Sequence, residues 1–217
     1  MEIPLFPLRT VLFPGMPLPM RIFEERYKIM TRELLESGGG FGVVLIRDGN
    51  EVGGGAIPHN AGTIAHIEES REIDNGRFIL MARGARRFRL VRMLPPNPYP
   101  RGEIEYVDET YDPADMLVKS ASETVRATFP AYFRLALSRT EQWARDMRLP
   151  TNAHDLVNFV APWLQVEEEA KQRLLDADTA VARLAELATV LDDLLARTRD
   201  EVMDYRRQRY GGLGAQS

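Results

Sequence analysis

The 217-residue sequence contains no cysteine, and only three of its basic residues are lysines. Without cysteine there can be no disulfides, no thiolate metal sites and no cysteine nucleophile, and this composition fits a cytoplasmic protein. The sequence also lacks any run of about 18 apolar residues, the length that a membrane span needs. Its N-terminus has neither the basic region nor the proline-free apolar run of a signal peptide. We therefore predict a cytoplasmic protein without a membrane segment.

The sequence has little net charge of either sign. Its 28 basic and 32 acidic side chains give a formal net charge of −4 at pH 7. Residues 1–112 and residues 113–217 each carry 14 basic and 16 acidic residues, so neither part has the basic excess of a non-specific nucleic-acid binder. With 44% hydrophobic residues, the chain can nevertheless bury a sizeable core.

Sequence motifs for catalysis are also lacking. There is no GxxxxGK[ST] phosphate loop, no GxSxG nucleophile elbow and no HExxH zinc motif. The glycine runs at 38–42 and 53–55 do not complete GxGxxG, and we predict flexible connections there. The three histidines, His59, His66 and His154, have no metal-ligand spacing. We predict no enzymatic activity, no metal and no cofactor.

The first half of the chain has the pattern of a small β-barrel with one early helix. Short β-branched and aromatic runs alternate with glycine, and Asp48-Gly49 and Asn75-Gly76 are turn signals between them. Apolar residues at three- and four-residue spacing predict a helix over 23–37, which Gly38 ends. The predicted strands are FGVVLI (41–46), GTIAHIEES (62–70), RFILMARGARRFRLV (77–91) and GEIEYVDE (102–109).

From about Asp112 the pattern becomes helical, which makes the predicted fold class α+β. We expect a barrel over 1–112, a helical bundle over 113–209 and a disordered tail over 210–217. Leu184, Leu187, Leu191 and Leu194 form a seam on the last helix, which either packs inside its own bundle or joins two copies, so both a monomer and a dimer fit. The predicted helices span 113–128 and 131–148, with a break near Pro130, then 154–164, 166–177 and 179–209.

Five prolines fall within the first nineteen residues. Pro14-Gly15 suits the centre of a type II turn, with glycine supplying the positive φ. Pro17 and Pro19 cannot donate to a strand ladder, so we predict an edge strand or an extended bridge there. A turn flanked by prolines cannot bury all its apolar side chains, and methionine suits adaptable binding surfaces. The predicted peptide-binding residues are Phe13, Met16, Met20 and, from the proline-rich loop at 94–102, Tyr99.

The segment RGARRFRLVR (83–92) offers a second interpretation. Its five arginines could bind phosphates as in an RNA-binding strand, or they could pair with neighbouring acids such as Glu103 and Glu105. The balanced charge of this half favours the pairing, so we predict that nucleic acid is not the partner. The arginines of the alternative are Arg83, Arg86, Arg87, Arg89 and Arg92.

Residues 3–30, IPLFPLRTVLFPGMPLPMRIFEERYKIM, resemble the opening of the Lon substrate-binding (Lon N-terminal) domain. The similarity continues through FGVVLI, GTIAHIEES, GRFILMARGARRFRLV and PYPRGEIEYVDE, and in the helical part through LVNFVAPWL and LLDADTAVARLAELATVL. The first block is highly specific, whereas the helical segments alone are weak signals. The resemblance covers nearly the whole chain, to about residue 209.

The resemblance implies a PUA-like β pseudo-barrel followed by a small helical bundle that ends in a long helix. It also implies a module that recognises unfolded or extended polypeptides and that could cooperate with a separate Lon protease or another protein. The ATPase phosphate loop and the protease motifs of Lon are not in this sequence, so it resembles the stand-alone bacterial proteins made of this domain, and no catalytic residue carries over.

Overall fold

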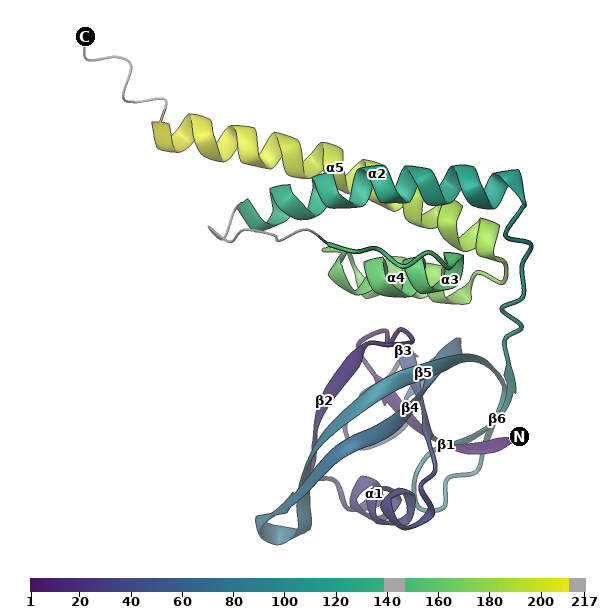
Figure 1. Cartoon of the computed structure of the whole chain (residues 1–217). Coiled ribbons are helices and arrows are strands. Elements are labelled where there is room, and N and C mark those ends of the chain that lie inside the picture. Colours follow the sequence, from purple (N-terminus) through teal and green to yellow (C-terminus); the bar gives the residue numbers. More distant parts are fainter. Residues whose placement is uncertain (139–146, 211–217) are drawn as a thin grey trace. The chain divides into compact units, whose positions relative to one another are not determined.

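The computed structural model describes residues 1–138 and 147–210 (Figure 1). It divides into two compact units. The first contains residues 1–109 and 166–178, and the second contains residues 110–165 and 179–217. The sequence predicts one boundary at residue 112. The first unit is instead discontinuous, because it also includes residues 166–178 from the helical half of the chain.

The first unit is built on a six-stranded sheet with one helix in its first half, α1 (Glu25–Ser37). The sheet order is β2-β5-β4-β3-β1-β6, and β5 also pairs with β6. This extra pairing closes a ring of five strands and leaves β2 attached to β5 alone. The strands are β1 (Glu2–Leu8), β2 (Pro17–Ile22), β3 (Phe41–Asp48), β4 (Ile57–Ile73), β5 (Arg77–Leu94) and β6 (Arg101–Tyr106).

The turns form where the sequence predicts them. Gly15 has φ 82° and the amide of Met16 donates to the carbonyl of Phe13 over 3.0 Å, which makes the predicted tight turn before β2. Asn75 and Gly76, with φ 64° and 65°, turn the chain between β4 and β5. Gly38, with φ 68°, ends α1.

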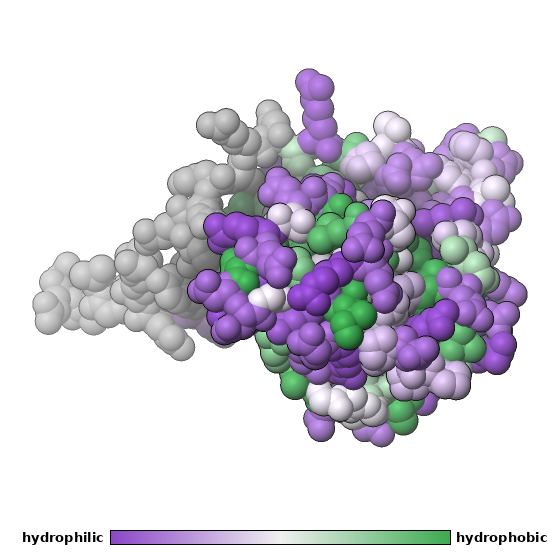
Figure 2. All heavy atoms as spheres, turned by 90° about the horizontal axis from the view of Figure 1, so that it is seen from below, coloured by the Kyte–Doolittle hydropathy of each residue, from purple (hydrophilic) through white to green (hydrophobic). Residues whose placement is uncertain are grey.

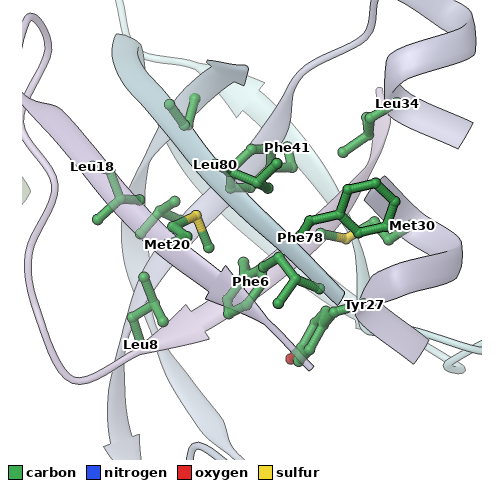
Figure 3. Close-up of a cluster of buried hydrophobic side chains, with 14 of the residues drawn as sticks. Phe6, Leu8, Leu18, Met20, Tyr27, Met30, Leu34, Phe41, Phe78 and Leu80 are labelled. Carbon is green, nitrogen blue, oxygen red and sulfur yellow. The ribbon is translucent and has the colours of Figure 1, made fainter. Parts of the chain in front are cut away.

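The interior of the barrel holds two apolar clusters. In the larger one, side chains from β1, β2, β3, β5 and α1 converge, as Figure 3 shows for Phe6, Met20 and Tyr27 among others. In the smaller one, the Phe88 ring fills the space that two glycines leave open: a Cβ atom on Gly42 or Gly62 would lie 2.7 or 2.6 Å from its Cζ atom. The barrel is therefore a packed core without a central channel.

The second unit is helical. Its elements are α2 (Met116–Ser138), α3 (Ala153–Val160), the short 3₁₀ turn η2 (Ala161–Trp163) and α5 (Ala180–Tyr210). α2 continues through Pro130, so the predicted break there is wrong. Residues 139–146 of the predicted 131–148 helix lie outside the described residues, and so does the predicted tail after Tyr210. Figure 1 shows α2 and α5 running alongside each other.

The leucine seam of α5 lies inside this unit. Leu184, Leu187 and Leu191 are fully buried, and Leu194 is nearly so. Because the leucines of α5 are already covered, the seam offers no apolar stripe to a second copy of the chain.

Asn152 caps α3, its side chain accepting a hydrogen bond from the amide of Asp155 over 3.1 Å.

Candidate functional site

The apolar residues that the sequence singles out belong to the core. Phe13 is completely buried, Met20 and Tyr99 are 8% exposed, and Met16 is half-buried against the larger cluster. The prediction of an exposed binding surface is wrong for Phe13, Met20 and Tyr99, whereas Met16 is partly exposed. The turn at Pro14-Gly15 folds back onto β5, where the amide of Gly84 donates to the carbonyl of Met16 over 3.0 Å.

Tyr99 anchors the proline-rich loop instead of facing solvent. Its hydroxyl donates a hydrogen bond to the carboxylate of Glu33 on α1. Burial, together with this bond and the charge of Glu33, raises the pKa of Tyr99 to about 12. The neutral phenol donates to Glu33 and so holds the loop at the side of α1.

Arg87 is the most deeply buried of the five predicted arginines. Its Nε donates to the carboxylate of Glu109 over 2.6 Å, and its Nη1 donates to the carbonyls of Leu175 and Ala177 over 2.7 and 2.9 Å. These carbonyls lie at the end of α4 (Glu168–Asp176) and directly after it. Arg87 thus holds the returning segment 166–178 on the barrel and cannot reach a phosphate.

The other four arginines also have partners within the first unit. Arg83 pairs with Glu68 at 2.5 Å, Arg92 pairs with Glu103 at 2.6 Å, and Arg89 pairs with Asp178. Arg86 lies 4.3 Å from the centre of the Tyr106 ring. These contacts agree with the interpretation that the arginines pair with neighbouring groups. The strand therefore does not present the row of free guanidinium groups that the RNA-binding alternative needs.

The open part of the barrel is the outer edge of β2. The carbonyl of Met16 faces β5, and β2 pairs with β5 in unbroken register from Pro17↔Arg83 to Ile22↔Phe78. Since backbone groups alternate along a strand, those of Pro17, Pro19 and Arg21 point away from β5. The pairing of β2 described in the structure is with β5 alone. This edge therefore offers three carbonyls but, because of the prolines, a single N–H.

A hollow of about 230 Å³ opens between β2 and β1. Its walls come from buried side chains of both strands, including Phe6, Leu8 and Met20. At its rim, Phe23 is 56% exposed and Val52 is 57% exposed. We call this the first hollow.

Phe23 also lines a second hollow, of about 380 Å³, on the side of β5. The two hollows share Arg21, Ile22 and Phe23, so Phe23 separates two adjoining depressions. Figure 2 shows one face of the molecule, on which apolar side chains form separate patches among hydrophilic ones. Because Phe23 lines both hollows, a bound chain could contact its exposed ring from either side.

The described residues hold no group of three or more His, Asp or Glu side chains placed to bind a metal ion. His59 lies 3.2 Å from Glu169, and His154 lies 3.1 Å from the guanidinium of Arg183 in the second unit.

In the part of the chain that the structure describes, no helix is long and apolar enough to cross a membrane.

Residues 2–193 match the family described as the ATP-dependent protease La (LON) substrate-binding domain. The chain belongs to the Lon substrate-binding domain family. Among solved structures it is similar to a Lon N-terminal domain protein from Xanthomonas campestris, with 28% identity, a TM-score of 0.60, and coverage of 87% of this chain and 98% of that one. The N-terminal domain of a Mycobacterium avium complex Lon protease has 19% identity and a TM-score of 0.65, covering 89% and 99%.

The curated relatives are much longer proteins. The Lon protease of Syntrophus aciditrophicus is 23% identical over 89% of this chain and 25% of the relative, and Lon protease 2 of Myxococcus xanthus is 23% identical over 91% and 24%. The chain thus spans about a quarter of their length. The matched part is the Lon substrate-binding domain, which is not itself catalytic, and membership supports a role as a substrate-recognition module.

Phe23, Val52 and Arg21, which line the first hollow, are not among the binding residues that the sequence predicts. The sequence predicts a helix over 23–37, with Phe23 as its first residue, but α1 begins at Glu25 and leaves the ring outside it. The signal available was Glu24-Glu25, because acids favour the first turn and so place the start of the helix after Phe23.

Proposed function

We propose that this chain is a non-enzymatic polypeptide-binding module that holds an extended segment of an unfolded protein in the first hollow. The observation that carries the proposal is the position of Phe23, an exposed aromatic ring at the junction of two hollows beside an unpaired strand edge. Family membership supports the same class of partner.

The binding would combine strand addition with apolar burial. A client strand beside β2 could donate N–H groups to the outward carbonyls of Pro17, Pro19 and Arg21, while its large side chains cover Phe23 and Val52. Burying about 300 Å² of apolar surface contributes roughly 7 kcal/mol before ordering costs. Those costs are of similar size, so we expect weak binding of many different clients.

The partner proposed is the client polypeptide itself. A separate Lon protease is a further proposed partner, because the relatives carry this domain within a Lon protease. Co-elution of the two purified proteins with a shared unfolded client would test this second partner.

The first test is a titration of a fluorescently labelled, reduced and carboxymethylated protein, which stays unfolded. Burying a Phe side chain is worth about 1.5–3 kcal/mol, so Phe23→Ser should weaken binding about tenfold or more. The matched control is Val91→Ser, since Val91 is 51% exposed on the same unit and lines neither hollow. Absence of saturable binding at high micromolar concentration would refute the function, and equal losses in the two variants would refute the site.

A further inference from the structure

The second hollow lies on the outer face of β2 and the β4–β5 hairpin. The strand register puts Arg21 of β2 opposite Ile79 of β5, and Ile79 opposite Arg71 of β4. In the next row, Arg77 pairs with Ile73. Alternation along the strands therefore turns these five side chains to one face.

The floor and walls of this hollow are apolar. Ile22 and Phe78 are buried beneath it, Ile73 and Ile79 are half-buried, and Phe23 stands at its edge. The remaining lining residues are Arg21 and Arg77, and no carboxylate lines it. The hollow thus combines an aliphatic surface with two positive charges.

In the part of the chain that the structure describes, the arginines around the hollow have no acidic partner, in contrast to several other arginines of the same unit. Arg83, Arg92 and Arg101 each pair with a carboxylate. Among the described residues, none of the carboxylates lies within ion-pair distance of Arg21, Arg71 or Arg77, and Arg77 donates from its Nε only to the carbonyl of Asp74, over 3.0 Å.

Acidic side chains do occur nearby, but they leave this charge uncompensated. Glu69 is opposite Met81 in the strand register, one row beyond Arg71 and Ile79. Glu72 lies 3.9 Å from Arg32, on the face turned toward α1. A guanidinium with free donors binds a carboxylate in bidentate geometry, so the three arginines can accept acidic groups from outside.

We propose that the second hollow selects client segments in which a large apolar side chain is adjacent to Asp or Glu. This inference rests on the proposed function and names the sequence feature that the client presents. The apolar side chain enters between Phe23 and Ile79, and the neighbouring carboxylates bind Arg21, Arg71 or Arg77. A single-stranded nucleic acid fits less well, because the walls are aliphatic and Phe23 is the only exposed ring that lines the hollow.

The test uses labelled nine-residue peptides that share a Leu-Phe centre and differ only in its flanks, which are Glu, Ser or Lys. Anisotropy titrations at low salt should show the Glu-flanked peptide binding at least about tenfold more tightly than the Lys-flanked one. The double variant Arg21→Gln/Arg77→Gln keeps Arg71, so it should remove most of this difference, and it should leave the affinity of the Ser-flanked peptide unchanged. The control is Arg47→Gln, an exposed arginine of β3 that lines neither hollow.

The outcomes separate this inference from the function on which it rests. Equal affinity for the three peptides, with binding still lost in Phe23→Ser, would overturn the acidic preference and keep the polypeptide-binding function. No binding of any peptide, nor of the unfolded protein, would overturn both. Tight binding of a single-stranded RNA of similar length, with a steep salt dependence that Arg21→Gln/Arg77→Gln removes, would also overturn the peptide assignment.

Discussion

At the scale of single residues, close backbone contacts limit what the barrel tolerates. A Cβ atom on Gly84 would lie 2.3 Å from the carbonyl oxygen of Phe13. Gly84 also accepts a hydrogen bond from the amide of Gly15 over 2.8 Å, which joins the first turn to β5. The glycine is needed because two backbones approach at this point, and backbone atoms cannot move aside as a flexible side chain can.

We therefore expect Gly84→Ala to destabilise the protein by about 1–3 kcal/mol, the range for overpacked sites. Urea denaturation measures the change. Ala85→Ser, at the exposed neighbouring position, should stay within about 0.5 kcal/mol of the parent. Equal stability of Gly84→Ala and the parent would show that the turn can move away from β5.

Tyr27 makes the free energy of unfolding depend on pH in the alkaline range. Burial, as the largest effect, raises its pKa from 10.0 to about 12. Between these values the unfolded chain has lost a proton that the native protein keeps, so the free energy of unfolding falls as pH rises. Below the lower value this contribution is fully present.

Tyr27→Phe should make that fall shallower, because it removes one of the phenols that must ionise on unfolding. Urea midpoints measured at intervals from pH 9 to about 12 would show the slope. Midpoints compared at pH 7 control for any packing change. Identical slopes for the parent and the variant would contradict the burial of the neutral phenol.

The sequence predicts residue conformations better than residue exposure. The positive φ of Gly15 and the position of the turn follow from Pro14-Gly15 alone. The burial of Phe13 and Met20 does not, because alternation separates two faces of a strand without saying which is covered. For Met20 it is decided by the distant residues of β5 and α1 in the same apolar cluster.

At the scale of elements, α4 is the segment whose position the sequence does not reveal. Its composition predicts a helix of the second half, but its side chains bond to the barrel. The carboxylate of Glu168 accepts a hydrogen bond from the amide of Val11 over 2.6 Å, and the amide of Gln172 donates to the carbonyl of Ala61 over 3.1 Å. With Arg87, these bonds attach both ends and the middle of α4 to the first unit.

Arg87→Met should destabilise the first unit by about 1–3 kcal/mol, because it leaves the buried carbonyl of Leu175 without its hydrogen-bond donor. Hydrogen exchange should show faster exchange in 166–178. Arg92→Met in the same strand removes an exposed pair and should cost no more than about 1 kcal/mol. Similar losses in the two variants would show that α4 is held by its apolar contacts.

The strand and helix segments are largely predictable, because hydrophobic periodicity and turn residues act locally. The break expected at Pro130 is the exception. The buried neighbours Phe129 and Tyr132 continue the apolar face on both sides of the proline, and their packing stabilises the helix despite the missing backbone donor.

At the scale of the whole molecule, two separate segments of the chain form the barrel unit. The first unit needs residues 1–109 and also residues 166–178. A division near Asp112, which the sequence suggests, separates Arg87 from Leu175 and Ala177. The candidate site is predictable only at this scale, because the open edge of β2 results from the closure of the other five strands into a ring.

We expect a chain of residues 1–112 to be less stable than the same unit in the intact protein. Joining residues 164–178 to it by a flexible Gly/Ser linker should restore a cooperative urea transition with a higher midpoint. Arg87→Met in the joined chain should cancel the gain. A chain of residues 1–112 that already unfolds at the midpoint of the joined chain would contradict the discontinuous unit.

The two prolines of β2 also bear on which strand can pair with that edge. A neighbouring molecule of the same protein would present the same shortage of donors, so Pro17 and Pro19 of two copies would face each other's carbonyls without an N–H between them. A foreign extended chain with ordinary residues supplies the missing hydrogens. The edge therefore favours pairing with a foreign extended chain over pairing with β2 of a second copy, which brings a single outward N–H, that of Arg21.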